Sequence, residues 1–129
     1  MKAFTILLVD DDADDQLFFL EAISAIDKSM HCDVACNGLE AIKWLNRVPT
    51  EHPSVIFLDL NMPKMNGYEC LEQIKSKDAT KEIPVIIFST TSNPKEAERI
   101  KNMGARNFLT KTSDFRKLKL QLGEILHAI

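Results

Sequence analysis

The carboxylates that end two apolar runs are the residues whose types and spacing could do chemistry. Asp59 follows the run Val55–Leu58 in the segment VIFLDLNMPKMNG, and Asp10 and Asp11 follow the run Phe4–Val9. An apolar run followed by a loop with proline and glycine is typical of a buried strand. A charge at the end of a buried strand costs free energy unless another group compensates it. These acids therefore indicate an anionic pocket.

The elements that must position these acids alternate between strand and helix. We predict strands at Phe4–Val9, Cys32–Ala35, Val55–Leu58, Val85–Phe88 and Asn107–Leu109. Helix starts are indicated at Asn37 and Asn66, each three residues before a glutamate as in a capping box, and at Asn93, which precedes Pro94. This alternation predicts a doubly wound α/β fold, with a parallel sheet covered by helices on both faces.

Such a fold also predicts where a ligand binds, because ligands lie outside the carboxyl ends of the strands. Besides the three acids, Ser89 and Thr90 follow the fourth predicted strand and Lys111 follows the fifth. A hydroxyl and an amine would thus join three carboxylates at one edge of the sheet.

This set of residues predicts metal-dependent phosphoryl chemistry. Three close carboxylates repel one another, and a hard divalent cation relieves the repulsion. Mg²⁺ binds one or two carboxylates together with phosphate oxygens, so Asp10, Asp11 and Asp59 fit it, with the backbone carbonyl of Asn61 as a further ligand. Mn²⁺ is the alternative ion. Asp59 is the predicted nucleophile, since carboxylates form aspartyl-phosphates.

Lys111 and Ser89 complete the predicted pocket. The Lys111 ammonium would hold a phosphoryl oxygen, and the Ser89 hydroxyl would donate to another. Taken singly, each residue has an ordinary explanation: the acids cap helices, the serine lies in a turn and the lysine is solvated. Their coincidence at one edge of the sheet favours the joint interpretation.

At this point the chain resembles the receiver domain of the two-component response regulators, of the small stand-alone, chemotaxis-regulator type. The motifs are LLVDD, LDLNMPKMNG, PVIIFSTT and FLTK. The acidic start and the STTSNPKE loop are also similar to the small regulators that partner bacteriophytochromes. The resemblance implies a flavodoxin-like three-layer fold with strand order 2-1-3-4-5, forming a single domain over residues 1–129 with no output domain.

The resemblance also implies roles and partners. The implied roles are phosphoacceptor for Asp59, Mg²⁺ ligands for Asp10, Asp11, Asp59 and the Asn61 carbonyl, phosphate contact for Lys111, switch residues for Ser89 and Phe108, and tuning of dephosphorylation for Asn61 and Thr91. A sensor histidine kinase or histidine phosphotransfer protein would donate the phosphoryl group. The face made by the fourth helix, fifth strand and fifth helix would then change shape and signal by protein binding or phosphotransfer.

Departures from the family pattern are expected to matter. Thr112 follows Lys111 where the family commonly has proline in a cis bond. The sequence therefore does not decide whether the bond between Lys111 and Thr112 is cis or trans. Phe108 has no hydroxyl, which favours an inward, buried ring. Ser89 stands in place of the commoner threonine.

The additional acids Asp12, Asp14 and Asp15 lie in the loop after the first predicted strand and at the start of the helix expected to follow it, where negative charge is favourable. A contribution to cation affinity or partner choice is the alternative for these acids.

Two other functions stay as alternatives. A phosphohydrolase working through an aspartyl-phosphate needs a second aspartate two residues after the nucleophile, where this chain has Asn61. A docking pseudo-receiver would lack part of the pocket. We expect no enzyme activity beyond the chain's own phosphorylation and dephosphorylation, and a monomer or a phosphorylation-dependent dimer.

Composition sets further limits. The chain has 129 residues and a net charge of −3. Acids outnumber Lys/Arg nine to four before residue 49, whereas Lys/Arg outnumber acids after residue 90. The basic third lacks interleaved aromatic residues, which argues against direct nucleic-acid binding. Cys32, Cys36 and Cys70 are predicted to be free thiols filling the core in a reducing compartment. No run approaches a membrane span, so a cytoplasmic location is expected.

Overall fold

The computed structural model describes residues 4–47, 52–62, 64–90 and 93–129. Within them, strands and helices alternate in the order β1 (Thr5–Val9), α1 (Ala13–Ile26), β2 (His31–Ala35), α2 (Gly38–Arg47), β3 (Val55–Leu58), α3 (Gly67–Ser76), β4 (Val85–Ser89), α4 (Pro94–Asn102), β5 (Asn107–Thr110) and α5 (Phe115–His127).

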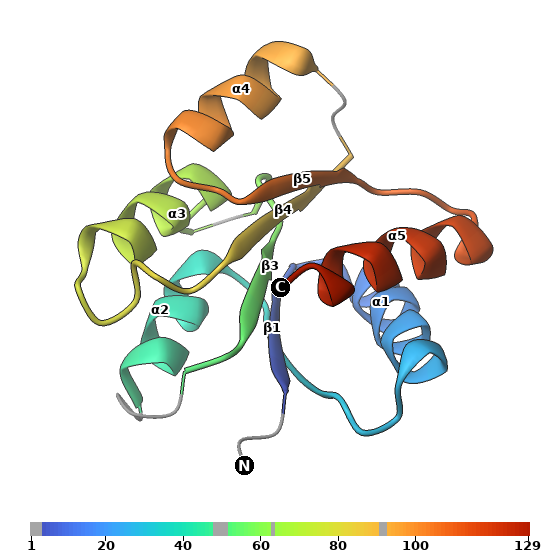
Figure 1. The fold of residues 1–129 in the computed structure, drawn as a ribbon. Helices are drawn as coiled ribbons and strands as arrows, with labels where there is room; N and C mark the ends of the chain where they lie inside the picture. The colour runs from blue at the N-terminus through green and yellow to red at the C-terminus, as the bar shows by residue number, and fades with distance from the viewer. Residues whose placement is uncertain (1–3, 48–51, 63, 91–92) are drawn as a thin grey trace.

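The strands form one parallel sheet in the order β2-β1-β3-β4-β5. Helices α1 and α5 lie together on one side of the sheet, and α2, α3 and α4 cover the other (Figure 1). The predicted three-layer α/β fold and strand order are confirmed. The chain reverses its direction across the sheet between β1 and β3, so the carboxyl ends of these two strands form the switch point.

The continuous apolar runs reflect burial on both faces of the sheet. In β1, Leu7 and Val9 pack towards α2 and α3, whereas Ile6 and Leu8 pack towards α1 and α5. All four residues of β3 are fully buried. A strand covered on both sides needs apolar residues at every position, and this rigid centre holds the residues that follow β1 and β3.

The predicted helix starts are confirmed, with one difference in detail. Asn66 and Glu69 form the capping box, since Asn66 Oδ1 accepts from the Glu69 N–H at 3.0 Å and Glu69 accepts in return at 3.5 Å. Asn37 Oδ1 accepts from the N–H three residues later at 2.8 Å. Asn93 instead accepts from the N–H of Lys95, two residues later.

Two local predictions concern Cys36 and the peptide bond between Lys111 and Thr112. Cys36 was predicted to fill the core, and this is wrong because β2 ends at Ala35 and the Cys36 side chain beyond it is exposed. The bond between Lys111 and Thr112 is trans, as are all peptide bonds of the described residues.

Among the described helices, none has the length and apolar character needed to cross a membrane.

Candidate functional site

Asp10 and Asp59 lie side by side at the carboxyl ends of the adjacent strands β1 and β3. The N–H of Asp10 donates to Ala35 O at 3.0 Å, and the N–H of Asp59 donates to Val9 O at 2.9 Å. Hydrogen bonding between neighbouring strands thus extends through both aspartates. Asp10 is completely buried and Asp59 is 6% exposed, so both carboxylates are held in place at low dielectric.

Asp11 joins this pair from the first residue beyond Asp10. One carboxylate oxygen from each of Asp10, Asp11 and Asp59 lies within 4.8 Å of the others. Asp11 is exposed while the other two are buried, so the cluster opens to solvent on one side. Oxygen donors at this spacing, with an open side for water, fit a hard cation such as Mg²⁺. The structure therefore brings together the three predicted carboxylate ligands.

Lys111 supplies the compensating positive charge. Its N–H donates to Ser89 O at 2.7 Å, which fixes its backbone beside β4. Its Nζ donates to Asp10 at 2.7 Å, to Asp15 at 2.8 Å and to Asp59 at 3.5 Å. Only 11% of the Lys111 side chain is exposed. The ammonium is therefore shared among three carboxylates.

Asp15 belongs to the site, although the sequence alone predicted no specific contact for it. Sequence reasoning placed it with the acids that favour a helix start, and Asp12 does serve as the N-cap of α1 by accepting from the Asp15 N–H at 3.0 Å. The Asp15 carboxylate, however, faces Lys111 from a position 96 residues away in the chain. Only the acidic run itself could have pointed to this contact.

The pKa shifts follow from burial and from these ion pairs. Burial raises the pKa of Asp59, and the Asp10 charge adds to this, while Lys111 opposes it. Burial likewise raises the pKa of Asp10 against the hydrogen bond from Lys111. Burial opposes the Lys111 charge, but its contacts with Asp10, Asp15 and Asp59 hold its pKa above the usual range. The single ammonium of Lys111 therefore neutralises only part of the negative charge of these carboxylates.

The start of α3 packs directly against the backbone of Asp59. A Cβ added at Gly67 would lie 2.4 Å from Asp59 O and 2.5 Å from Leu60 Cα. Glycine is therefore required for α3 to approach this closely. Nearby, the N–H of Asn61 donates to Asp59 Oδ1 at 3.4 Å. Asn61 is exposed, and ligation of a cation by its carbonyl stays a prediction.

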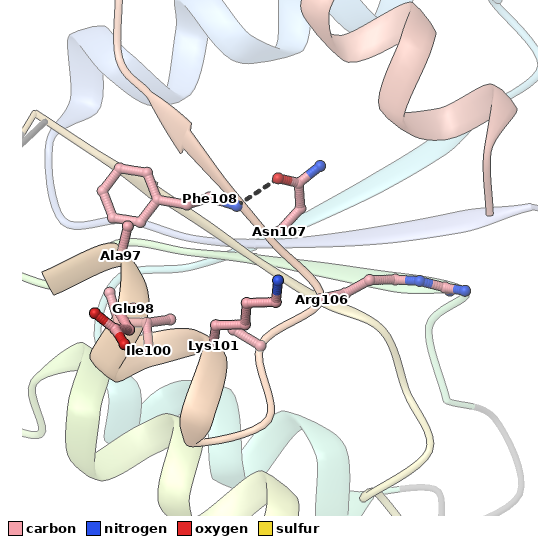
Figure 2. A pocket seen from close by; sticks show the side chains of 8 residues that line it. Ala97, Glu98, Ile100, Lys101, Arg106, Asn107 and Phe108 are labelled. Carbon is pink, nitrogen blue, oxygen red and sulfur yellow. Dashed lines mark hydrogen bonds between the residues drawn. The ribbon is translucent and has the colours of Figure 1, made fainter. Parts of the chain in front are cut away.

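The two predicted switch residues lie on β4 and β5. Ser89 ends β4 and is fully buried, yet its Oγ has no hydrogen-bond partner among the described residues. Phe108 is half-buried rather than fully inward, and its ring lies beside Ala97 in a cavity of about 360 Å³ between α4 and β5 (Figure 2). Thr91, predicted to tune dephosphorylation, lies outside the described residues.

Comparison with known families decides the identity. Residues 6–122 match the family described as "Response regulator receiver domain". The chain belongs to this family. The predicted receiver identity is therefore confirmed, and receiver domains of this family typically bind Mg²⁺ and accept a phosphoryl group from histidine kinases.

Curated relatives carry this receiver within proteins of several kinds. A probable cyclic di-GMP phosphodiesterase of Vibrio cholerae is 32% identical over 115 residues, covering 89% of this chain and 25% of that protein. Protein PilG of Pseudomonas aeruginosa is 31% identical over 100 residues, covering 76% of this chain and 72% of that protein. The chain spans 25%, 43% and 30% of three relatives that it matches, from Vibrio cholerae, Porphyra purpurea and Treponema denticola.

Solved receiver structures superpose along nearly the whole chain. The phosphorylated cyanobacterial phytochrome response regulator RcpA gives a TM-score of 0.86 at 28% identity, covering 96% of this chain and 91% of that one. The Mn²⁺-bound form of response regulator Rcp1 gives 0.80 at 30% identity, covering 95% and 91%. These neighbours are similar to this receiver in fold and in sequence.

Proposed function

We propose that this receiver is the phosphorylatable switch of a two-component phosphorelay, with Asp59 as the phosphoacceptor. The supporting observation is the convergence of Asp10, Asp11 and Lys111 on the Asp59 carboxylate. Residues 1–129 would act as one receiver domain that signals through protein partners. We expect it to work in the cytoplasm and to catalyse only its own phosphorylation and dephosphorylation.

The proposed reaction starts from a phosphohistidine on a sensor kinase or histidine phosphotransfer protein. An oxygen of Asp59 attacks phosphorus in line, so that a P–O bond forms while the P–N bond breaks and its electron pair leaves with the imidazole. Lys111, which Asp10 and Asp15 hold beside Asp59, would donate to an oxygen of the transferring group. Bound Mg²⁺ or Mn²⁺, held by Asp10, Asp11, Asp59 and the Asn61 carbonyl, would neutralise charge on the phosphoryl oxygens.

The response to phosphorylation would begin at Ser89. Its buried Oγ has no partner among the described residues, so it can donate to a phosphoryl oxygen without giving up another hydrogen bond. Ser89 O accepts from the N–H of Lys111, the residue after β5, and Phe108 pairs with Ile87 in the same strand pair. Movement of Ser89 would therefore reach the cavity between α4 and β5, and the face made by α4, β5 and α5 would change shape.

The lifetime of the phosphoryl group would depend on residues beside the path of hydrolytic water. Asn61 and Thr91 occupy these positions by resemblance. The phosphohydrolase alternative lacks an acid at Asn61, where general acid–base catalysis would need one.

A small phosphoryl donor tests the proposal directly. The protein is incubated with acetyl phosphate and Mg²⁺, and its intact mass is measured beside that of Asp59→Asn. We expect one added phosphoryl group on the wild type, none on the variant, and loss of the gain when EDTA is added. Equal gain by both proteins, or no gain by the wild type, would contradict the proposal.

A further inference from the structure

Asp15 is an acid of the site that the proposed phosphoryl transfer does not use. It lies in the first turn of α1, and its carboxylate accepts from Lys111 Nζ at 2.8 Å. It is not one of the three carboxylates that lie close enough together to share a cation. The side chain that caps α1 is that of Asp12. Neither metal ligation nor helix capping therefore explains where the Asp15 carboxylate lies.

All the hydrogen-bond donors of the Lys111 ammonium already face acceptors. A lysine ammonium has three N–H donors, and Lys111 Nζ contacts one oxygen each of Asp10 at 2.7 Å, Asp15 at 2.8 Å and Asp59 at 3.5 Å. A phosphoryl group on Asp59 needs a short hydrogen bond from this ammonium. The ammonium can supply it only by moving towards Asp59 and away from one of the other two acceptors.

Of those two acceptors, Asp15 is the one that can give way. Asp10 is completely buried, whereas 41% of the Asp15 side chain is exposed. A cavity of about 400 Å³ adjoins the ion pair, and both Asp15 and Lys111 line it. The Asp15 carboxylate therefore has water and space into which it can turn, and the Asp10 carboxylate has neither.

The contact with Asp15 also keeps the ammonium at a distance from Asp59. Nζ lies closer to the Asp15 oxygen than to the Asp59 oxygen. It is 5.5 Å from the centre of the Phe88 ring, which packs on the side of the sheet covered by α1 and α5. Because both oxygens contact the same Nζ, the Asp15 charge would also lie close to a phosphoryl group on Asp59 and would repel it.

We propose that Asp15 competes with the phosphoryl group of Asp59 for the Lys111 ammonium and thereby limits the stability of the phosphorylated state. Asp15 is a positioning residue, because it acts through Lys111 and does not touch the reacting atoms. The unphosphorylated protein keeps the contact between Asp15 and Lys111, and the phosphorylated protein must weaken it. This inference rests on the proposed function, which supplies the competing phosphoryl group.

Binding of fluoroberyllate, an inert mimic of a phosphoryl group on a carboxylate, tests the competition at equilibrium. The Tm of the full chain is measured against fluoroberyllate concentration at saturating Mg²⁺, which gives the Kd. Asp15→Asn keeps the shape of the side chain and removes its charge. We expect it to tighten binding about fivefold, as the loss of one partly exposed competing ion pair allows. A gain in affinity cannot come from a damaged fold, which would weaken binding.

Two control variants separate this competition from a general effect of charge. Asp14→Asn removes the neighbouring first-turn acid, which is exposed and has no ion pair among the described residues, and should change the Kd less than about twofold. Asp15→Glu keeps the charge and should bind like the wild type.

The outcomes distinguish this inference from the proposed function. A wild-type Tm that does not respond to fluoroberyllate would overturn both. A wild type that binds the mimic, with Asp15→Asn binding it equally or more weakly, or with Asp14→Asn tightening binding as much as Asp15→Asn, would overturn the role of Asp15 alone.

Discussion

Lys111 donates a 2.7 Å hydrogen bond to Asp10, whereas its distance to Asp59 is 3.5 Å. The other Asp59 oxygen accepts from the Asn61 N–H at 3.4 Å, so both of its hydrogen bonds are long. The ammonium is held mainly by Asp10 and Asp15, and the Asp59 oxygens are left weakly engaged. A nucleophile with weak ground-state hydrogen bonds loses little when it forms a new bond.

Removing the shared cation should destabilise the fold, and divalent metal should recover the loss. Lys111→Met leaves three close carboxylates without their ammonium, so we expect a loss of roughly 3 kcal/mol in the free energy of unfolding with EDTA present. Mg²⁺ should recover more stability in the variant than it adds to the wild type. Urea unfolding with and without Mg²⁺ measures both effects, and Lys43→Met is the exposed control, expected within about 0.5 kcal/mol. An equal loss with and without Mg²⁺ would argue against charge compensation by Lys111.

Asp59→Asn should stabilise the metal-free protein at neutral pH. Because burial and the Asp10 charge raise the folded-state pKa of Asp59, its ionised form destabilises the fold at every pH above that pKa. We expect a gain on the order of 1 kcal/mol, or about 3 °C in Tm. The gain should shrink as pH falls through the raised pKa towards 3.8, because Asp59 is then protonated. Thermal unfolding across this range in EDTA checks the sign, and a gain that grows on acidification would contradict it.

Metal binding should depend on Asp11 although this residue is exposed. Mg²⁺ that binds only the folded protein raises its Tm. Asp11→Asn should leave the Tm in EDTA nearly unchanged and weaken Mg²⁺ binding about tenfold, read from the Mg²⁺ dependence of Tm. Asp14→Asn, the control, removes an exposed acid of α1 outside the carboxylate cluster. Equal weakening by both variants would mean that overall charge, and not ligation, sets the metal affinity.

Gly67→Ala should be strongly destabilising because its Cβ would lie 2.4 Å from the carbonyl oxygen of Asp59. We expect a loss of about 3 kcal/mol, since backbone on both sides must shift. Gly123→Ala is the matched control, with open space at its Cβ, and should gain about 1 kcal/mol in dilute solution. Urea unfolding compares the two. Similar effects at the two positions would contradict the close approach of α3 to Asp59.

Local signals predicted the fold and the core of the site well. The run Val55–Leu58 coincides with β3, and the capping box at Asn66 forms as expected. These features depend on neighbouring residues and on burial of both sheet faces. The carboxyl edge of a parallel sheet then brings Asp10, Asp59 and Lys111 together without further information.

The features that the sequence did not reveal depend on contacts between distant segments. The pairing of Asp15 with Lys111 joins the first turn of α1 to the residue after β5, and the acidic run gives no indication of which acid turns inward. The half-buried ring of Phe108 depends on how closely α4 packs over β5. Cys36 was wrongly assigned to the core because it directly follows the strand, and the sequence does not show that its side chain faces solvent once the paired part of β2 has ended at Ala35.

Chemical mapping of the phosphorylated residue tests the central claim most directly. An acyl phosphate is reduced by borohydride to an alcohol, so an aspartyl-phosphate becomes homoserine at the modified position. The protein is treated with acetyl phosphate and Mg²⁺, reduced, digested and sequenced by mass spectrometry. We predict homoserine at Asp59, with none when Mg²⁺ is replaced by EDTA. Homoserine at another aspartate, or an unmodified Asp59 after the protein has gained phosphoryl mass, would contradict the assignment.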